Sequence, residues 1–160
     1  MAYSETPYTI EGAAGNEQFP INGEDILTIV ESALTHPTHA DGFVDEGDPV
    51  ICGAICGIAL KSAAAATDMI PIKRTGVWSL TVTAQNGQGN SNIAVGEVAY
   101  LDTSTCVISK ITTGRPFGIF LNTMTGSATP GILPVLVEPN LGSFILDDLT
   151  ARVLVLETTN

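Results

Sequence analysis

The stretch that decides the fold is Glu46-Gly47-Asp48-Pro49-Val50-Ile51-Cys52-Gly53-Ala54-Ile55-Cys56-Gly57-Ile58-Ala59-Leu60. A Gly-Asp-Pro turn signal opens it, and small and β-branched residues fill it. The glycines at positions 53 and 57 favour a bent strand that is buried on both faces. Its ending, Gly57-Ile58-Ala59-Leu60, is echoed by Gly118-Ile119-Phe120-Leu121. Two such strands predict one closed β unit that bends at its glycines.

Downstream of this stretch, short apolar runs alternate with turn residues every 8 to 15 positions. This spacing is typical of an all-β sandwich or barrel. The segment Thr103-Ser104-Thr105 separates two of the runs and predicts a hairpin. Pro134 predicts that its strand lies at a sheet edge. The predicted strands are 49–60, 69–74, 76–83, 96–101, 106–111, 116–122, 132–137 and 152–157.

The segment Val77-Trp78-Ser79-Leu80-Thr81-Val82-Thr83 alternates cleanly between two sets of side chains. Because successive side chains of a strand point to opposite faces, Trp78, Leu80 and Val82 are predicted to face the core. The polar loop 85–92 and the loop 123–131 are predicted to form exposed tips.

Upstream of the opening stretch, residues 1–45 are predicted to be an extension of a β domain that spans residues 46–160. Residues 1–23 are too polar for a core but carry scattered aromatic and apolar side chains, which favours an arm that orders on binding. Glu24–Leu34 follows a plausible Asn-Gly cap and predicts one short helix, although Ile-Leu-Thr-Ile-Val is equally good strand material.

The charge is strongly negative and unevenly placed. The chain carries 17 acidic and 6 basic residues, a net charge of -11, and residues 1–48 hold ten acids and no Lys or Arg. Such a surface argues against nucleic acid as a direct partner, because phosphate binding needs clustered cations, and neither nucleic acid nor a membrane is expected as a partner. An acidic leader on a near-neutral body is either a solvated face or an arm that docks on a basic protein surface.

The three cysteines lack the spacing of a disulfide scaffold and are predicted to be reduced. The N-terminus has no signal-peptide pattern, and no window reaches 18 uninterrupted apolar residues, so no export signal and no membrane span is expected.

Motifs for catalysis are missing from the sequence. No G-x-S-x-G, P-loop, G-x-G-x-x-G or H-E-x-x-H pattern occurs, and Asp147-Asp148 is interpreted as a solvated turn. His36 and His39 lie three residues apart with Asp41, Asp45 and Asp48 nearby, a set that could bind a divalent metal. The loop lacks a known metal spacing, so neither a metal nor any other cofactor is predicted, and the chain is not expected to be an enzyme.

Several motifs, in order and at matching intervals, resemble the capsid cement (head decoration) proteins of tailed bacteriophages. The similarity covers about residues 46–137. The motifs are Gly47-Asp48-Pro49-Val50, Gly53, Gly57-Ile58-Ala59, Ile72-Lys73-Arg74-Thr75-Gly76-Val77-Trp78, Gly96-Glu97-Val98-Ala99-Tyr100-Leu101-Asp102, Gly114-Arg115-Pro116-Phe117-Gly118-Ile119 and a closing V-x-V strand. The first 45 residues and the insertion 138–150 depart from the compact members.

The resemblance implies a mainly β subunit with a small β-barrel or β-tulip-like domain. It also implies a homotrimer on the outside of an icosahedral head, where it cements capsomers of the major capsid protein. The expected structural core positions are Gly53, Gly57, Trp78 and Gly118, and the expected capsid-binding positions in the arm are Tyr3, Tyr8, Ile10 and Phe19. An alternative is a ligand- or glycan-binding β module on a virion or cell surface that uses the 85–92 and 123–131 tips.

Overall fold

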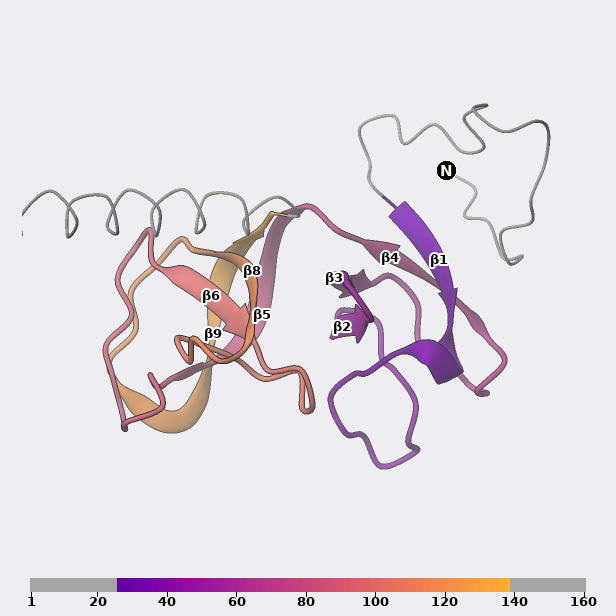
Figure 1. The fold of residues 1–160 in the computed structure, drawn as a ribbon, viewed down its shortest axis with the longest axis horizontal. Helices are drawn as coiled ribbons and strands as arrows, with labels where there is room; N and C mark the ends of the chain where they lie inside the picture. The colour runs from indigo at the N-terminus through magenta and orange to yellow at the C-terminus, as the bar shows by residue number, and fades with distance from the viewer. Residues whose placement is uncertain (1–25, 139–160) are drawn as a thin grey trace, which may run out of the picture.

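Two β units lie side by side in the structure, a computed structural model that describes residues 26–138 (Figure 1). The first is a four-stranded sheet of order β1-β4-β3-β2, and the second is a closed barrel of order β5-β7-β6-β8-β9. The predicted mainly β fold with a barrel is therefore confirmed. The elements are β1 (Ile26–Val30), the 3-10 turn η1 (Glu31–Ala33), β2 (Pro49–Cys52), β3 (Ile55–Ala59), β4 (Met69–Lys73), β5 (Gly76–Ala84), β6 (Val98–Leu101), β7 (Ile108–Ser109), β8 (Arg115–Phe120) and β9 (Ser127–Val137).

The opening stretch forms a hairpin, so the prediction of a single bent strand over 49–60 is wrong. β2 and β3 run antiparallel, with Cys52 opposite Ile55. Gly53 begins the reversal at φ +56°, a left-handed conformation that glycine adopts without strain. Gly53 is exposed in this turn, although it was expected in the core.

The short helix predicted over Glu24–Leu34 is also wrong for the residues described. Ile26–Val30 is strand β1, and only the three residues of η1 are helical. β1 pairs with β4 in antiparallel register from Ile26 opposite Lys73 to Val30 opposite Met69. Its β-branched residues suit a strand, and five positions of pairing with β4 outweigh the weak helical spacing.

The described part of the predicted extension is built into the first sheet. Besides β1, Thr35 forms a bridge with Ile51, and its amide and carbonyl both bond to that residue. The arm positions Tyr3, Tyr8, Ile10 and Phe19 lie outside the described residues, as does the predicted strand 152–157.

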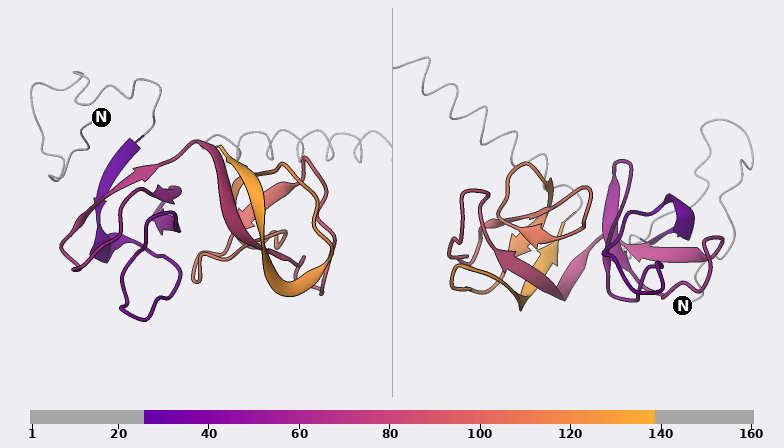
Figure 2. Two further views of the ribbon diagram at one scale, coloured as in Figure 1. Left: turned by 180° about the vertical axis from the view of Figure 1, so that it is seen from behind. Right: turned by 90° about the horizontal axis from the view of Figure 1, so that it is seen from below.

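The barrel is built around the long antiparallel pair of β5 and β9, which Figure 2 shows from two further sides. The alternation predicted for β5 is confirmed: Leu80 and Val82 are buried, whereas Val77 is 61% exposed. Trp78 is half-buried, packs against the core and donates its indole N–H to the Thr75 carbonyl at 3.1 Å.

Strand β9 is not an edge strand, so the prediction from Pro134 is wrong. β9 pairs with β5 on one side and with β8 on the other, which closes the barrel. Pro134 lies opposite Ser79, and its carbonyl accepts a hydrogen bond from the Leu121 amide. β9 begins at Ser127, so the second half of the predicted 123–131 tip is strand.

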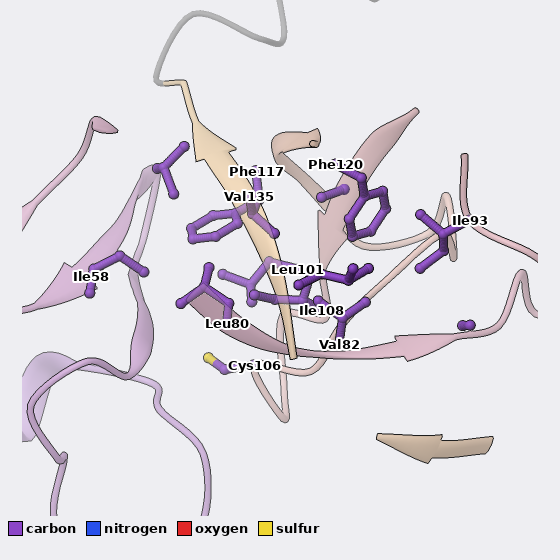
Figure 3. Close-up of a cluster of buried hydrophobic side chains, with 14 of the residues drawn as sticks. Ile58, Leu80, Val82, Ile93, Leu101, Cys106, Ile108, Phe117, Phe120 and Val135 are labelled. Atoms are coloured by element: carbon purple, nitrogen blue, oxygen red, sulfur yellow. The ribbon is translucent and has the colours of Figure 1, made fainter. Parts of the chain in front are cut away.

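The main core fills the barrel and reaches into the first sheet (Figure 3). Phe117 and Phe120 from β8 are its largest fully buried side chains. Ile51 and Ile58 belong to the same cluster although they come from β2 and β3. The two β units therefore share one apolar core. A smaller cluster lies within the first unit: Val44, Val50, Ala59, Ala63, Ile70 and Ile72.

The predicted hairpin of β6 and β7 is confirmed, with Leu101 opposite Ile108. Its turn is held by Asp102, whose Oδ1 accepts hydrogen bonds from the amides of Thr105 and Ser104 at 2.8 and 2.9 Å. The Thr105 hydroxyl donates to the same oxygen. These hydrogen bonds, the one from the Thr105 amide first, hold the pKa of Asp102 below its ordinary value.

Asp102→Ala is expected to lower the free energy of unfolding by about 1 kcal/mol at pH 7, because exposed turn amides lose a charged acceptor. The folded-state pKa lies below the unfolded value of about 3.9, so the stabilisation is present above that pH and disappears as the pH falls through the folded pKa. Urea unfolding at pH 7 and pH 2 measures this. If the difference in free energy of unfolding between wild type and variant is the same at both pH values, the role assigned to the carboxylate is wrong.

Candidate functional site

A cleft of about 310 Å³ opens between the two β units. Small polar and apolar side chains line it, with only His39, Asp48 and Cys106 carrying titratable groups among them. The first unit contributes Pro37, His39, Gly47, Asp48 and Pro49, and the barrel contributes Ser79, Leu80, Thr81, Thr83, Thr105, Cys106, Val107 and Pro130.

Cys106 is not a nucleophile under neutral conditions. Its thiol donates to the Thr35 carbonyl at 3.2 Å, which links the barrel to the first unit. Burial raises the pKa of Cys106 to about 12, so the thiol stays protonated. Cys52 and Cys56 are also free thiols in the structure.

Both histidines of the loop between η1 and β2 lie against carboxylates beside this cleft. His39 Nε2 is 2.6 Å from Asp48 Oδ2, and its Nδ1 is 3.5 Å from Asp45 Oδ2. His36 Nε2 is 3.2 Å from Glu31 Oε1. The two imidazole rings are parallel, with their centroids 6.2 Å apart.

The loop folds this way because Asp48 organises it from its far end. Asp48 Oδ2 also accepts a hydrogen bond from the Asp45 amide, which turns the chain just before β2. The hydrogen bond to Asp48 is the main cause of a raised pKa at His39, against a smaller opposing effect of burial. Within residues 26–138, His36, His39 and Asp48 form the one group of three side chains whose potential metal-ligand atoms all lie within 4.8 Å of one another.

The expected core positions lie in different environments. Gly57 and Gly118 are buried where neighbouring backbone leaves no room for a Cβ atom, whereas Trp78 is half-buried at the barrel wall. The tip 85–92 is largely exposed and closes on itself through a bridge between Gln85 and Asn90. The tip has no aromatic side chain, and sugar stacking would require one.

An apolar strip that was not predicted from the sequence runs over the outside of the barrel. Ile132 is 75% exposed on β9, and Leu136 lies between Val77 of β5 and Ile119 of β8. The sequence feature that could have predicted this strip is the unbroken apolar run 132–137, because such a strand presents apolar side chains to both faces. We define the outer apolar strip as Val77, Ile119, Leu121, Ile132, Pro134 and Leu136.

No helix in the described part of the chain has the length and apolar character needed to span a membrane.

Comparison with known proteins gives one match. A family model described as phage cement protein matches residues 30–136, from the last residue of β1 to the penultimate residue of β9. Neither the search of curated proteins nor the search of solved structures found a match.

Proposed function

Because the chain belongs to the phage cement protein family, we propose that it binds the outer surface of a phage capsid as a homotrimer and stabilises contacts between capsomers of the major capsid protein. Family membership makes it a structural component of the virion that associates with the capsid. The family match is the observation that carries the proposal, since it spans both β units. We further propose that the chain acts without catalysis, after synthesis in the host cytoplasm.

The outer apolar strip supports self-association. It lies on the outer face of neighbouring strands of a closed barrel, and Ile132, Val77 and Leu121 are exposed there. Around a three-fold axis, side chains near the axis meet their own symmetry copies, so a narrow strip is enough to make a closed assembly. Three linked subunits then present three identical footprints, and weak capsid contacts add through effective concentration.

The charge distribution supports a capsid contact through the N-terminal region. Residues 1–48 carry ten acids and no Lys or Arg, which would suit a basic surface on the shell protein. Tyr3, Tyr8, Ile10 and Phe19 are the anchors we propose in this region. They would add apolar contacts that charge alone cannot supply.

Deletion of residues 1–20 is expected to leave a folded trimer that no longer decorates heads. The deleted segment precedes β1, so the deletion keeps every strand found in residues 26–138. Purified protein is mixed with undecorated heads, and bound protein is measured by sedimentation and located by electron microscopy. A full-length variant with Tyr3, Tyr8, Ile10 and Phe19 replaced by serine should fail in the same way, because the acids remain and the anchors are gone.

Occupancy of three-fold positions by the wild-type protein supports the proposal. Full decoration by the truncated protein would show that the arm is not needed for capsid binding. If the wild-type protein does not bind heads at all, the proposed capsid role is wrong.

A further inference from the structure

We propose that His36, His39 and Asp48 bind a divalent transition-metal ion of the Zn²⁺ class. The sequence alone gave no recognisable metal spacing, because Asp48 lies nine residues beyond His39. The structure brings Asp48 back against the loop, and the three candidate ligand atoms lie within 4.8 Å of one another. Imidazole and carboxylate together suit zinc and its neighbours better than magnesium or calcium, which prefer oxygen ligands.

The distances are close to those a bound ion requires. Two ligands at zinc bond lengths of about 2.0 to 2.1 Å lie roughly 3.3 Å apart. His39 Nε2 and Asp48 Oδ2, at 2.6 Å, must separate slightly, and the widest pair, at up to 4.8 Å, must close by about 1.5 Å. Side-chain rotations can supply such shifts, because none of the three side chains is fully enclosed: 13% of His36, 27% of His39 and 14% of Asp48 is exposed.

Each imidazole has a carboxylate beside the ring nitrogen that would not bind the ion, an arrangement that is typical of metal-bound histidines. His39 points Nε2 at Asp48 and Nδ1 at Asp45, so the second carboxylate can hold the N–H while Nε2 binds the ion. Glu31 does the same for His36 Nε2, and its side chain is only 6% exposed. His36 then binds through Nδ1, which must exchange its present 2.7 Å contact with the Pro37 carbonyl for the ion.

The charge of the cluster calls for a cation. Glu31, Asp45 and Asp48 place three carboxylates around two imidazoles. The first Lys or Arg in the sequence is Lys61, so residues 1–60 contribute no Lys or Arg that could offset these carboxylates. When both imidazoles are neutral, binding of a dication reduces the net negative charge of the cluster from -3 to -1. Since His39 and Asp48 also line the cleft, the ion would lie at the border of the two β units.

Zinc titration of the full-length protein, produced without a histidine tag, tests the site by calorimetry at pH 7.5. We expect one Zn²⁺ per chain. His39→Gln and Asp48→Asn each remove a ligand and should weaken zinc binding by about 100-fold or more. Glu31 is a positioning residue, so Glu31→Gln should weaken binding by about 10- to 100-fold. The matched control is Asp41→Asn, which removes an exposed charge near His39 but keeps an acceptor for the Phe43 amide. Because solvent and salt screen that charge, its affinity should stay within about three-fold of the wild-type value.

Nuclear magnetic resonance of the wild-type protein provides a readout that needs no variant. The chain has two histidines, so two sets of imidazole signals are present, and both should shift on addition of one equivalent of Zn²⁺. Absence of zinc binding, or unchanged affinity in both His39→Gln and Asp48→Asn, would overturn the proposal. So would a Co²⁺ complex with thiolate charge-transfer bands, because that would place the ion on the cysteines. None of these results depends on capsid binding.

Discussion

Gly118→Ala is expected to lower the free energy of unfolding by at least about 3 kcal/mol. Gly118 lies in β8 between Ala99 of β6 and Val137 of β9. A Cβ atom at this position would collide with the carbonyl oxygen of Leu136 and would lie 2.9 Å from Val135 Cγ1. The carbonyl cannot withdraw, because β5 pairs with the other side of β9. Overpacking usually costs about 1–3 kcal/mol, and here the obstacle is backbone, so the cost should reach or exceed the upper end.

Such a loss is a large part of the 5–15 kcal/mol that stabilises a typical domain. Urea unfolding followed by circular dichroism measures it. The matched control is Gly131→Ala on β9, where the nearest atom is the Cε of Met124, the far end of a flexible side chain. That variant should stay within about 1 kcal/mol of the wild type. Equal unfolding midpoints for Gly118→Ala and Gly131→Ala would show that β8 and β9 can separate, contrary to a tightly closed barrel.

Alternation and turn residues made much of the barrel predictable. In β5 one set of side chains is apolar and the other mostly polar, so both the strand and its inward face could be recognised. The hairpin of β6 and β7 followed from the three polar residues between two apolar runs. These are local features of the sequence, and each predicts its element without knowledge of the partner strand.

The errors arose where a partner strand decides the structure. Ile26–Val30 is apolar at nearly every position, so neither helical nor strand periodicity is clear, and pairing with β4 settles it. Pro134 indicated an edge because closure of the barrel by β8 and β9 is a tertiary property. Gly53 was read as a bend within one strand, whereas its positive φ reverses the chain.

The histidine cluster could be predicted only in part. The sequence placed His36 and His39 near several aspartates, but it did not indicate which carboxylate meets which ring. Asp48 is selected by the turn at Asp45, and Glu31 by η1, and both depend on how the loop packs on the first sheet. The family match from residue 30 includes this loop, which lies before the stretch 46–137 where the resemblance was found.

Ile132→Asp is expected to convert the proposed homotrimer into monomers without unfolding the barrel. Ile132 is 75% exposed and lies opposite the exposed Thr81, so an aspartate there is solvated in the single subunit. In the trimer the variant loses about 1.5–3 kcal/mol of apolar burial for each of three copies. It also brings three carboxylates together near the axis, in a chain whose net charge is already -11.

Analytical ultracentrifugation of the full-length protein measures the change in mass, and circular dichroism checks that the fold is kept. The control is Thr129→Asp, which adds the same charge to an exposed position of the same strand outside the outer apolar strip, and which should remain a trimer. A trimer that survives Ile132→Asp would mean that another surface joins the subunits. Because capsid affinity depends on three linked footprints, the monomeric variant should also lose most of its decoration of heads.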